Sequence, residues 1–258
     1  MLDYRKLNSI TKYPSILTYH KITGKGRLLE DRVETSIFDA ESTINVYEKI
    51  NGENSRIVLL GDGLNVDYFI GSREELLLAK GDRIGNAIGN IAEHFTPVAD
   101  ELCLKLKGFK GLIALYFESY GGNTPHTKEY SSDKTQNGRL FDVFALSQEE
   151  LDSILEMPLS KIAGWRDRGN QPFYDCEQRM EFANNNELQV APLLTSIKGK
   201  ELPVDVKGMA EWLEQFRETR VGINTTGQSE GVICRTKNRE VIAKIRIEEY
   251  DRTLKSRK

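Results

Sequence analysis

A lysine stands inside a stretch that otherwise reads as a pair of buried strands. Residues 46–57 have the sequence VYEKINGENSRI, in which Lys49 lies three positions before Gly52, with strand-forming residues on both sides. A lysine is almost never fully buried without a partner, so this position calls for a paired charge or a ligand. The stretch therefore predicts a strand that ends in a tight polar turn and carries a functional lysine.

The composition describes an ordinary globular chain and excludes several functional classes. The 258 residues carry a net charge of −3 and are 39% hydrophobic. No apolar run approaches the roughly 20 residues of a membrane helix, and the N-terminus lacks the apolar core of a signal peptide. We therefore expect a cytoplasmic protein with no membrane partner. The net charge argues against bulk attraction to nucleic acid but leaves room for a local basic groove.

The three cysteines and three histidines are scattered along the chain. Their spacing fits neither a closed disulfide framework nor a zinc site. The chemistry must therefore come from other side chains.

Strand patterns outnumber helical ones. The runs RIVLL, VDYFIGSR, GLIALYFESYGG, RLFDVFAL, SEGVICRT and VIAKIRIEEY read as strands. A helix is predicted over residues 83–95, which Pro97 would interrupt, and another over DVKGMAEWLEQFRE. Ser147 and Glu150 form a capping box at the start of a third helix. Many strands with few helices predict an α+β fold with antiparallel sheets, and no domain boundary is evident.

Six charged residues stand beside small or apolar neighbours in strand-like surroundings: Lys49, Arg73, Glu118, Glu230, Lys244 and Arg246. Because side chains alternate along a strand, Lys244 and Arg246 should point the same way from their sheet. Two glutamates and four cations that converge would suit a phosphate-rich ligand together with a divalent metal.

The order and spacing of this set resemble the covalent nucleotidyltransferase superfamily of ATP-dependent ligases and mRNA capping enzymes. The matching segments, in the order of motifs I, Ia, III, IIIa, IV and V, are EKING, GSR, FESYGG, FDVFAL, SEGVI and AKIRI. The opening KYPSI, the pair Glu48–Lys49 and Asn54 five residues after the lysine make the chain most similar to the RNA ligase 2-like branch. This resemblance implies a ligase-type, ATP-grasp-like core in which antiparallel sheets flanked by helices form a nucleotide-binding groove.

The resemblance also implies a set of catalytic residues. Lys49 would attack the α-phosphorus of ATP, form lysyl-AMP and release pyrophosphate. Lys244 and Arg246 would hold the α-phosphate, and Glu230 would assist Mg²⁺ or Mn²⁺ directly or through water. A protonated lysine cannot attack, and neighbouring cations favour its neutral form. We therefore expect Lys49 to lie inside because it must lose its proton.

The remaining implied residues contact the nucleotide or the RNA end. Glu48 would read the adenine amino group, Phe144 would stack on the adenine, and Glu118 would hold a ribose hydroxyl. The other expected contacts are Ile50, Asn54, Arg73, and Val232 or Ile233. Two positions depart from the usual pattern: Arg246 stands where ligases have lysine, and Asn51 stands where many members have aspartate. Arginine keeps the charge but requires a forked geometry.

Only a few residues follow motif V in this sequence, so we expect no further domain after it. We expect one nucleotidyltransferase domain over residues 1–258, without a C-terminal OB-fold or helical domain, whose place a partner protein could take. Three functions remain open. The favoured one is an ATP-dependent RNA ligase that joins a 5′-phosphate to a 3′-hydroxyl. The others are an adenylyltransferase acting on a DNA end or a protein, and a non-catalytic RNA-end binder.

Overall fold

The chain folds into two compact units built from alternating segments. The structure is a computed structural model that describes residues 2–85 and 90–256. Unit 1 comprises Met1–Pro14, Gly52–Pro125 and Gln136–Val190, and unit 2 comprises Ser15–Asn51, His126–Thr135 and Ala191–Lys258. Because the chain passes from one unit to the other five times, no single linker marks a boundary in the sequence.

Unit 1 contains a six-stranded antiparallel sheet with the order β7-β6-β5-β4-β8-β9. Its strands are β4 (Glu53–Asp62), β5 (Val66–Ser72), β6 (Leu76–Ala79), β7 (Asp82–Arg83), β8 (Lys110–Gly121) and β9 (Gln136–Leu146). Its helices are α1 (Tyr4–Thr11), α2 (Ile91–Lys105), α4 (Gln148–Glu156), α5 (Leu159–Asp167) and α6 (Cys176–Asn185). The predicted capping box of Ser147 and Glu150 is confirmed at the start of α4.

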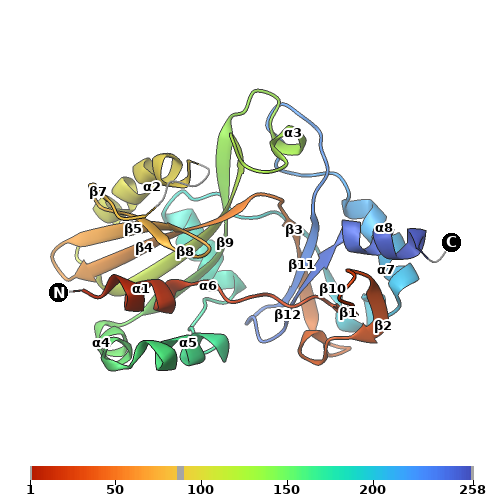
Figure 1. The fold of residues 1–258 in the computed structure, drawn as a ribbon, viewed down its shortest axis with the longest axis horizontal. Helices are drawn as coiled ribbons and strands as arrows, with labels where there is room; N and C mark the ends of the chain where they lie inside the picture. Colours follow the sequence, from red (N-terminus) through yellow and green to blue (C-terminus); the bar gives the residue numbers. More distant parts are fainter. Residues whose placement is uncertain (1, 86–89, 257–258) are drawn as a thin grey trace. The chain divides into compact units, whose positions relative to one another are not determined.

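Both faces of this sheet are covered, which explains why the central residues of β4 (57–60) and of β8 (112–117) are all apolar or aromatic. One face packs against α2 and α6 through residues such as Ile57, Leu115 and Phe95. The opposite face packs against α1, α4 and α5 through residues such as Val58 and Tyr116. Figure 1 shows α2 on one side of the sheet and α1, α4 and α5 on the other.

The predicted helix over residues 83–95 is confirmed only for residues 91–95: Arg83 belongs to β7, and residues 86–89, which include Ile88, lie outside the described residues. The helix α2 begins at Ile91 and continues through Pro97 to Lys105. A proline inside a helix removes one backbone hydrogen bond and costs about 3 kcal/mol. Pro97 lies on the exposed side of α2, whereas Ile91 and Phe95 are buried against the sheet. The burial of this apolar side therefore outweighs the local cost of the proline.

Unit 2 contains a four-stranded antiparallel sheet with the order β10-β3-β11-β12 and a separate pair β1-β2. Its strands are β1 (His20–Ile22), β2 (Leu28–Arg32), β3 (Thr43–Lys49), β10 (Leu193–Lys198), β11 (Gly231–Thr236) and β12 (Ile242–Arg246). Its α-helices are α3 (Thr127–Tyr130), α7 (Val206–Leu213) and α8 (Ile247–Lys255). Short 3₁₀ turns lie at Glu34–Ser36, Gly199–Glu201 and Glu214–Phe216.

One face of the unit 2 sheet forms a core with α7 and α8. Val46, Val232 and Ile245 contribute to this core from the strands, and Met209 and Tyr250 contribute from the helices. The predicted amphipathic helix is confirmed as α7 and the 3₁₀ turn that follows it. The opposite face carries Lys49 of motif I and Lys244 and Arg246 of motif V.

The final predicted strand, VIAKIRIEEY, is too long. β12 ends at Arg246, and α8 begins at Ile247. Ile247, Tyr250 and Thr253 are buried along one side of α8, which is a helical spacing rather than a strand spacing.

The fold confirms the predicted α+β class with antiparallel sheets. Among the helices that the structure describes, none has the length and apolar character needed to cross a membrane.

Candidate active site around Lys49

Lys49 is the last residue of β3 and points away from the core of unit 2. Along this strand Ile44 and Val46 face the core, so the odd-numbered residues Tyr47 and Lys49 face the other side. Lys49 pairs in register with Gly231 of β11. Only 18% of the Lys49 side chain is exposed, so its ammonium is largely shielded from solvent.

Glu230 joins the two cations of the site. One of its carboxylate oxygens accepts a hydrogen bond from Lys49 Nζ, and the other accepts one from Arg246 Nε at 2.6 Å. The Glu230 backbone N–H also donates to the Lys49 carbonyl oxygen at 3.0 Å. The nearest charge to Lys49 is therefore a carboxylate, whereas the sequence predicted that cations surround the lysine. Lys49 is held as half of an ion pair.

Arg246 ends β12 and holds a second carboxylate as well. Its Nη1 donates to Glu249 Oε1 at 2.9 Å, while its Nε serves Glu230. Burial lowers the pKa of Arg246, but the hydrogen bond and charge of Glu249, together with Glu230, outweigh burial and raise the pKa above its usual value. Arg246 therefore keeps a permanent positive charge beside Lys49 and Glu230.

The predicted alternation along β12 is confirmed. Ala243 and Ile245 are buried in the core, whereas Lys244 and Arg246 are half-buried on the opposite face. Lys244 pairs in register with Ile233 of β11.

The structure distinguishes between the two apolar candidates on β11. Val232 is fully buried in the core, whereas Ile233 is half-buried and pairs with Tyr47 on the Lys49 side of the sheet. Ile50, which follows the lysine, is only 3% exposed. Of the apolar residues expected to contact the base, Ile233 thus has the more accessible side chain in unit 2.

The position of Glu48 corrects the expected adenine contact of its side chain. Glu48 is 3% exposed and pairs with Val232, so it lies on the core side of the sheet, opposite to Lys49. Its Oε1 accepts from the Thr219 hydroxyl, and its Oε2 accepts from the Arg220 N–H at 2.8 Å. Neighbouring residues of a strand face opposite sides, so these two side chains cannot serve one ligand from the same face.

Unit 1 holds a row of polar residues at one end of its sheet. Asn54 of β4 pairs with Glu118 of β8, which in turn pairs with Arg139 of β9. Arg73 follows β5 directly, one position beyond Ser72, and its side chain is 56% exposed. The structure thus brings together the predicted residues of motifs Ia and III and Asn54.

Glu118 also fixes the start of β4. Its Oε1 accepts a hydrogen bond from the Gly52 N–H at 3.1 Å. A Cβ atom on Gly52 would lie 2.1 Å from the Ser119 carbonyl oxygen, so no other residue fits there without moving β8. The glycine of motif I is required for this close backbone approach.

Phe144 does not occupy the predicted position. It is fully buried, and its ring packs against Tyr116 and Phe173 with centroid distances of 6.2 and 5.6 Å. Its partner in β8 is Ala114, four residues from Glu118, or roughly 13 Å along the strand at about 3.3 Å per residue. The expected stacking on adenine is corrected accordingly: Phe144 is a core residue of unit 1.

Another aromatic residue of the same motif remains partly exposed. Phe141 is half-buried and lies at a bulge of β9, where the register with β8 shifts. Sequence reasoning passed over Phe141 because a bulge interrupts the regular alternation of a strand and is not visible in the pattern. It also passed over Thr219 and Glu249, which become partners of site residues only in the folded chain.

The described residues contain no cluster of three or more histidine, cysteine or acidic side chains that could hold a metal ion. Glu230 is the acidic side chain nearest to Lys49, and both of its oxygens already have partners. Magnesium is commonly bound through one or two carboxylates together with substrate phosphates. The residues therefore fit a metal that arrives with a nucleotide, and they do not form a metal cage of their own.

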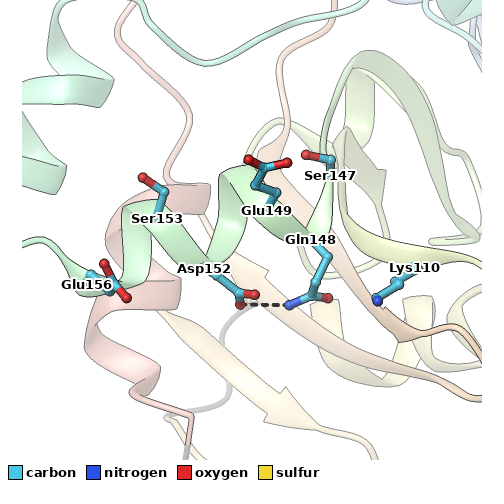
Figure 2. A pocket seen from close by; sticks show the side chains of 7 residues that line it. All are labelled: Lys110, Ser147, Gln148, Glu149, Asp152, Ser153 and Glu156. Atoms are coloured by element: carbon cyan, nitrogen blue, oxygen red, sulfur yellow. Dashed lines mark hydrogen bonds between the residues drawn. The ribbon is translucent and has the colours of Figure 1, made fainter.

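A groove of about 720 Å³ lies along α4 of unit 1, away from the predicted residues. Figure 2 shows its lining side chains, including Lys110 and the pair Gln148–Asp152, whose hydrogen bond measures 2.8 Å. Its three carboxylates, on Glu149, Asp152 and Glu156, outnumber its one lysine. Such a surface disfavours a phosphate-rich ligand.

The fold is similar to that of solved RNA ligases from Naegleria gruberi. A mutant solved with ATP and Mn superposes with a TM-score of 0.55 and 14% identity, over 95% of this chain and 62% of that one. The ligase solved with PPi gives a TM-score of 0.53, 15% identity and the same coverage. Another mutant, solved with AMP and Mn, gives 0.53 and 13% identity over 93% and 61%. The chain thus spans less than two thirds of these ligases.

A comparison with curated protein sequences finds no match. The sequence model of the RNA ligase family matches residues 42–246. This range includes Lys49, Glu118, Glu230, Lys244 and Arg246. This match covers most of the chain and the six predicted motifs except for Ile247, the last residue of AKIRI. The chain therefore belongs to the RNA ligase family.

Proposed function

We propose that the protein is an ATP-dependent RNA ligase in which Lys49 forms lysyl-AMP. The observation that carries this proposal is the Lys49–Glu230–Arg246 arrangement: a shielded lysine is paired with a carboxylate that a second cation also holds. Membership of the RNA ligase family and the match to a ligase fold solved with ATP and Mn support it.

In the first step, the Lys49 nitrogen attacks the α-phosphorus of ATP. A bond between nitrogen and phosphorus forms, the bond between the α-phosphorus and the bridging oxygen breaks, and pyrophosphate leaves. The ammonium must lose one proton before it attacks and a second as the nitrogen–phosphorus bond forms; Glu230 is hydrogen-bonded to the nitrogen and can accept one of them, and the departing pyrophosphate can take the other. Glu230 thus acts as the base, whereas the sequence had predicted only that neighbouring cations favour the neutral form of Lys49.

Arg246 and Lys244 stabilise the charge that develops on the phosphate. Both side chains lie on the Lys49 side of the sheet, and preorganised cations lower the barrier to phosphoryl transfer. A divalent metal, when bound with the nucleotide, would neutralise further phosphate charge. Glu230 is the residue that would assist it.

The polar row of unit 1 serves the sugar and the RNA end. Glu118 would hold a ribose hydroxyl, and Asn54 and Arg73 would engage the ribose-phosphate or the RNA. Ile233 would pack on the base in unit 2, and Ile50 would support it from the buried side.

In the later steps, AMP passes from Lys49 to an RNA 5′-phosphate, and a 3′-hydroxyl then displaces AMP to form a 3′–5′ phosphodiester. A partner protein would supply further RNA contacts, beyond those made by the residues of this chain.

The first test is incubation of the protein with α-³²P-labelled ATP and Mg²⁺, followed by a denaturing gel. We expect one acid-labile AMP on the wild-type protein and on Lys207→Ala, an exposed control, and none on Lys49→Ala. Absence of label from the wild-type protein with Mg²⁺ or Mn²⁺ would reject the lysyl-AMP mechanism and favour an RNA-end binder.

The second test chases the labelled protein with 5′-phosphorylated RNA, 5′-phosphorylated DNA or a protein mixture. Transfer to RNA, and joining to a 3′-hydroxyl end, is the expected result. Transfer only to DNA or protein would identify an adenylyltransferase with another substrate.

A further inference from the structure

Two connecting segments of unit 2, the second of which contains α3, hold the chain on either side of Lys49, and we call them the two loops. Residues 217–230 supply Thr219 and Arg220, whose hydroxyl and backbone N–H both donate to the Glu48 carboxylate. Residues 126–135 supply Tyr130, whose hydroxyl oxygen accepts the Asn51 N–H at 2.9 Å. The residue before the lysine and the second residue after it are therefore both held by side-chain contacts.

The same two loops are bonded to each other. The Ile223 N–H donates to the Tyr130 carbonyl oxygen at 2.7 Å, and the Ser132 N–H donates to the Ile223 carbonyl oxygen at 3.3 Å. The Gln228 N–H donates to Glu129 at 2.9 Å. A continuous set of hydrogen bonds thus connects Glu48, through both loops, to Asn51.

The loop of residues 217–230 also ends at the partner of the lysine. Glu230 follows directly on this loop, and its N–H bonds to the Lys49 carbonyl oxygen. A shift of the loop would therefore move the lysine and its carboxylate together. We call the five residues Glu48, Asn51, Tyr130, Thr219 and Arg220 the Lys49 clamp.

We propose that Glu48, Thr219 and Tyr130 are positioning residues that hold Lys49 in line for attack on the nucleotide. This inference rests on the proposed lysyl-AMP function. Of the three residues, only Glu48 belongs to one of the six motifs. Tyr130 and Thr219 are 0% and 6% exposed. Buried hydrogen bonds to a charged carboxylate are strong, so they restrain the segment that they hold.

The burial of Glu48 separates this role from adenine recognition. Both of its oxygens have donors from the 217–230 loop, and its side chain lies on the core side of β3. A positioning residue affects the rate of the chemical step, whereas a residue that reads adenine affects ATP binding and base selectivity.

The experiment compares Thr219→Val, which removes the hydroxyl at nearly constant volume, with Thr219→Ser, which keeps it. Tyr130→Phe tests the other end of the clamp. Thr11→Val is the matched control, because it removes a buried threonine hydroxyl bonded within α1 of unit 1. The measurements are the single-turnover rate of AMP attachment over a range of ATP concentrations, and amide hydrogen exchange in residues 46–52 and at Arg220.

We expect Thr219→Val and Tyr130→Phe to slow AMP attachment at saturating ATP on the order of ten- to a hundredfold, because small displacements of a reacting group have effects of this size. The ATP concentration for half-maximal rate should change less than about twofold. Hydrogen exchange in residues 46–52 should become faster, by roughly tenfold. Thr219→Ser should restore the rate, and Thr11→Val should leave both measurements unchanged.

The proposed positioning role would be overturned if a folded Thr219→Val protein attached AMP at the wild-type rate. It would also be overturned if the substitution changed only the ATP concentration for half-maximal rate. Unchanged hydrogen exchange in residues 46–52 would overturn it even without an activity measurement. If the wild-type protein attached no AMP, the proposed function would fail as well, and that result is distinct from a rate that the variants leave unaltered.

Discussion

Arg246 holds two carboxylates with one guanidinium, which gives a physical reason for its departure from the lysine usual in ligases. Its Nε binds Glu230 and its Nη1 binds Glu249, so the fork spans two acceptors. A lysine presents one nitrogen and cannot reproduce both directions at once. The motif position thus carries an ion-pair network.

We predict that Arg246→Lys slows AMP attachment to Lys49 by roughly tenfold and that Arg246→Leu slows it by on the order of a hundredfold. Lysine keeps the charge, whereas leucine also leaves Glu230 with one partner fewer. The measurement is the initial rate of protein labelling by ATP. Arg252→Lys is the control, because its pair with Glu248 is exposed and should contribute little. Equal rates for Arg246→Lys and wild type would show that the fork is not needed.

At the level of single elements, α1 shows how a short helix is fixed to a sheet. Its last carbonyl groups have no partners within the helix, and buried groups of this kind require other donors. The donors to Asn8, Ser9, Ile10 and Thr11 are Arg56, Arg166, Gln171 and Tyr116, at 3.3, 3.0, 2.8 and 2.8 Å. Burial lowers the pKa of Arg56 to about 10, which still leaves it charged at neutral pH beside the negative end of the helix.

We predict that Gln171→Leu destabilises the protein by about 1–3 kcal/mol, because its amide serves both Ile10 and Lys12 and leaves two carbonyl groups without this donor. Urea unfolding would give the free energy. Gln148→Leu is the control, since its hydrogen bond to Asp152 is exposed and its loss should change stability by less than about 0.5 kcal/mol. Equal effects of the two substitutions would contradict the capping role.

On the scale of the whole molecule, each unit is assembled from three segments that are interrupted by segments of the other. Unfolding of one unit therefore removes the fixed ends of segments in the other. The segments of the unfolded unit then become long flexible loops between segments of the folded unit, and the entropic cost of closing a loop grows with its length. This arrangement favours a single cooperative transition.

We predict that Cys103 of unit 1 and Cys234 of unit 2 become reactive at the same urea concentration. Both are buried, and burial raises the pKa of each thiol, so the native protein should react slowly with a thiol reagent. Mass spectrometry after pulsed labelling would follow each site. If Cys234 reacted at a clearly lower urea concentration, unit 2 would unfold on its own.

The features that could be predicted from the sequence are those set by neighbouring residues. The alternation of Lys244 and Arg246, the capping box at Ser147 and the strands around Lys49 follow from local spacing, and the order of the motifs indicated the family. The course of α2 through Pro97 and the start of α8 at Ile247 depended on which side each helix buries. Such burial involves distant partners, which local patterns do not encode.

The environment of the site residues was decided by tertiary structure alone. Glu48 meets Thr219 across 171 positions, and Phe144 lies between core aromatics that come from other segments. A strand pattern specifies that successive side chains alternate, but it does not specify what covers each face. For that reason the sequence identified Lys49, Glu230 and Arg246 as candidates, while only the fold assigned Glu48 to the core side and gave Lys49 a carboxylate partner.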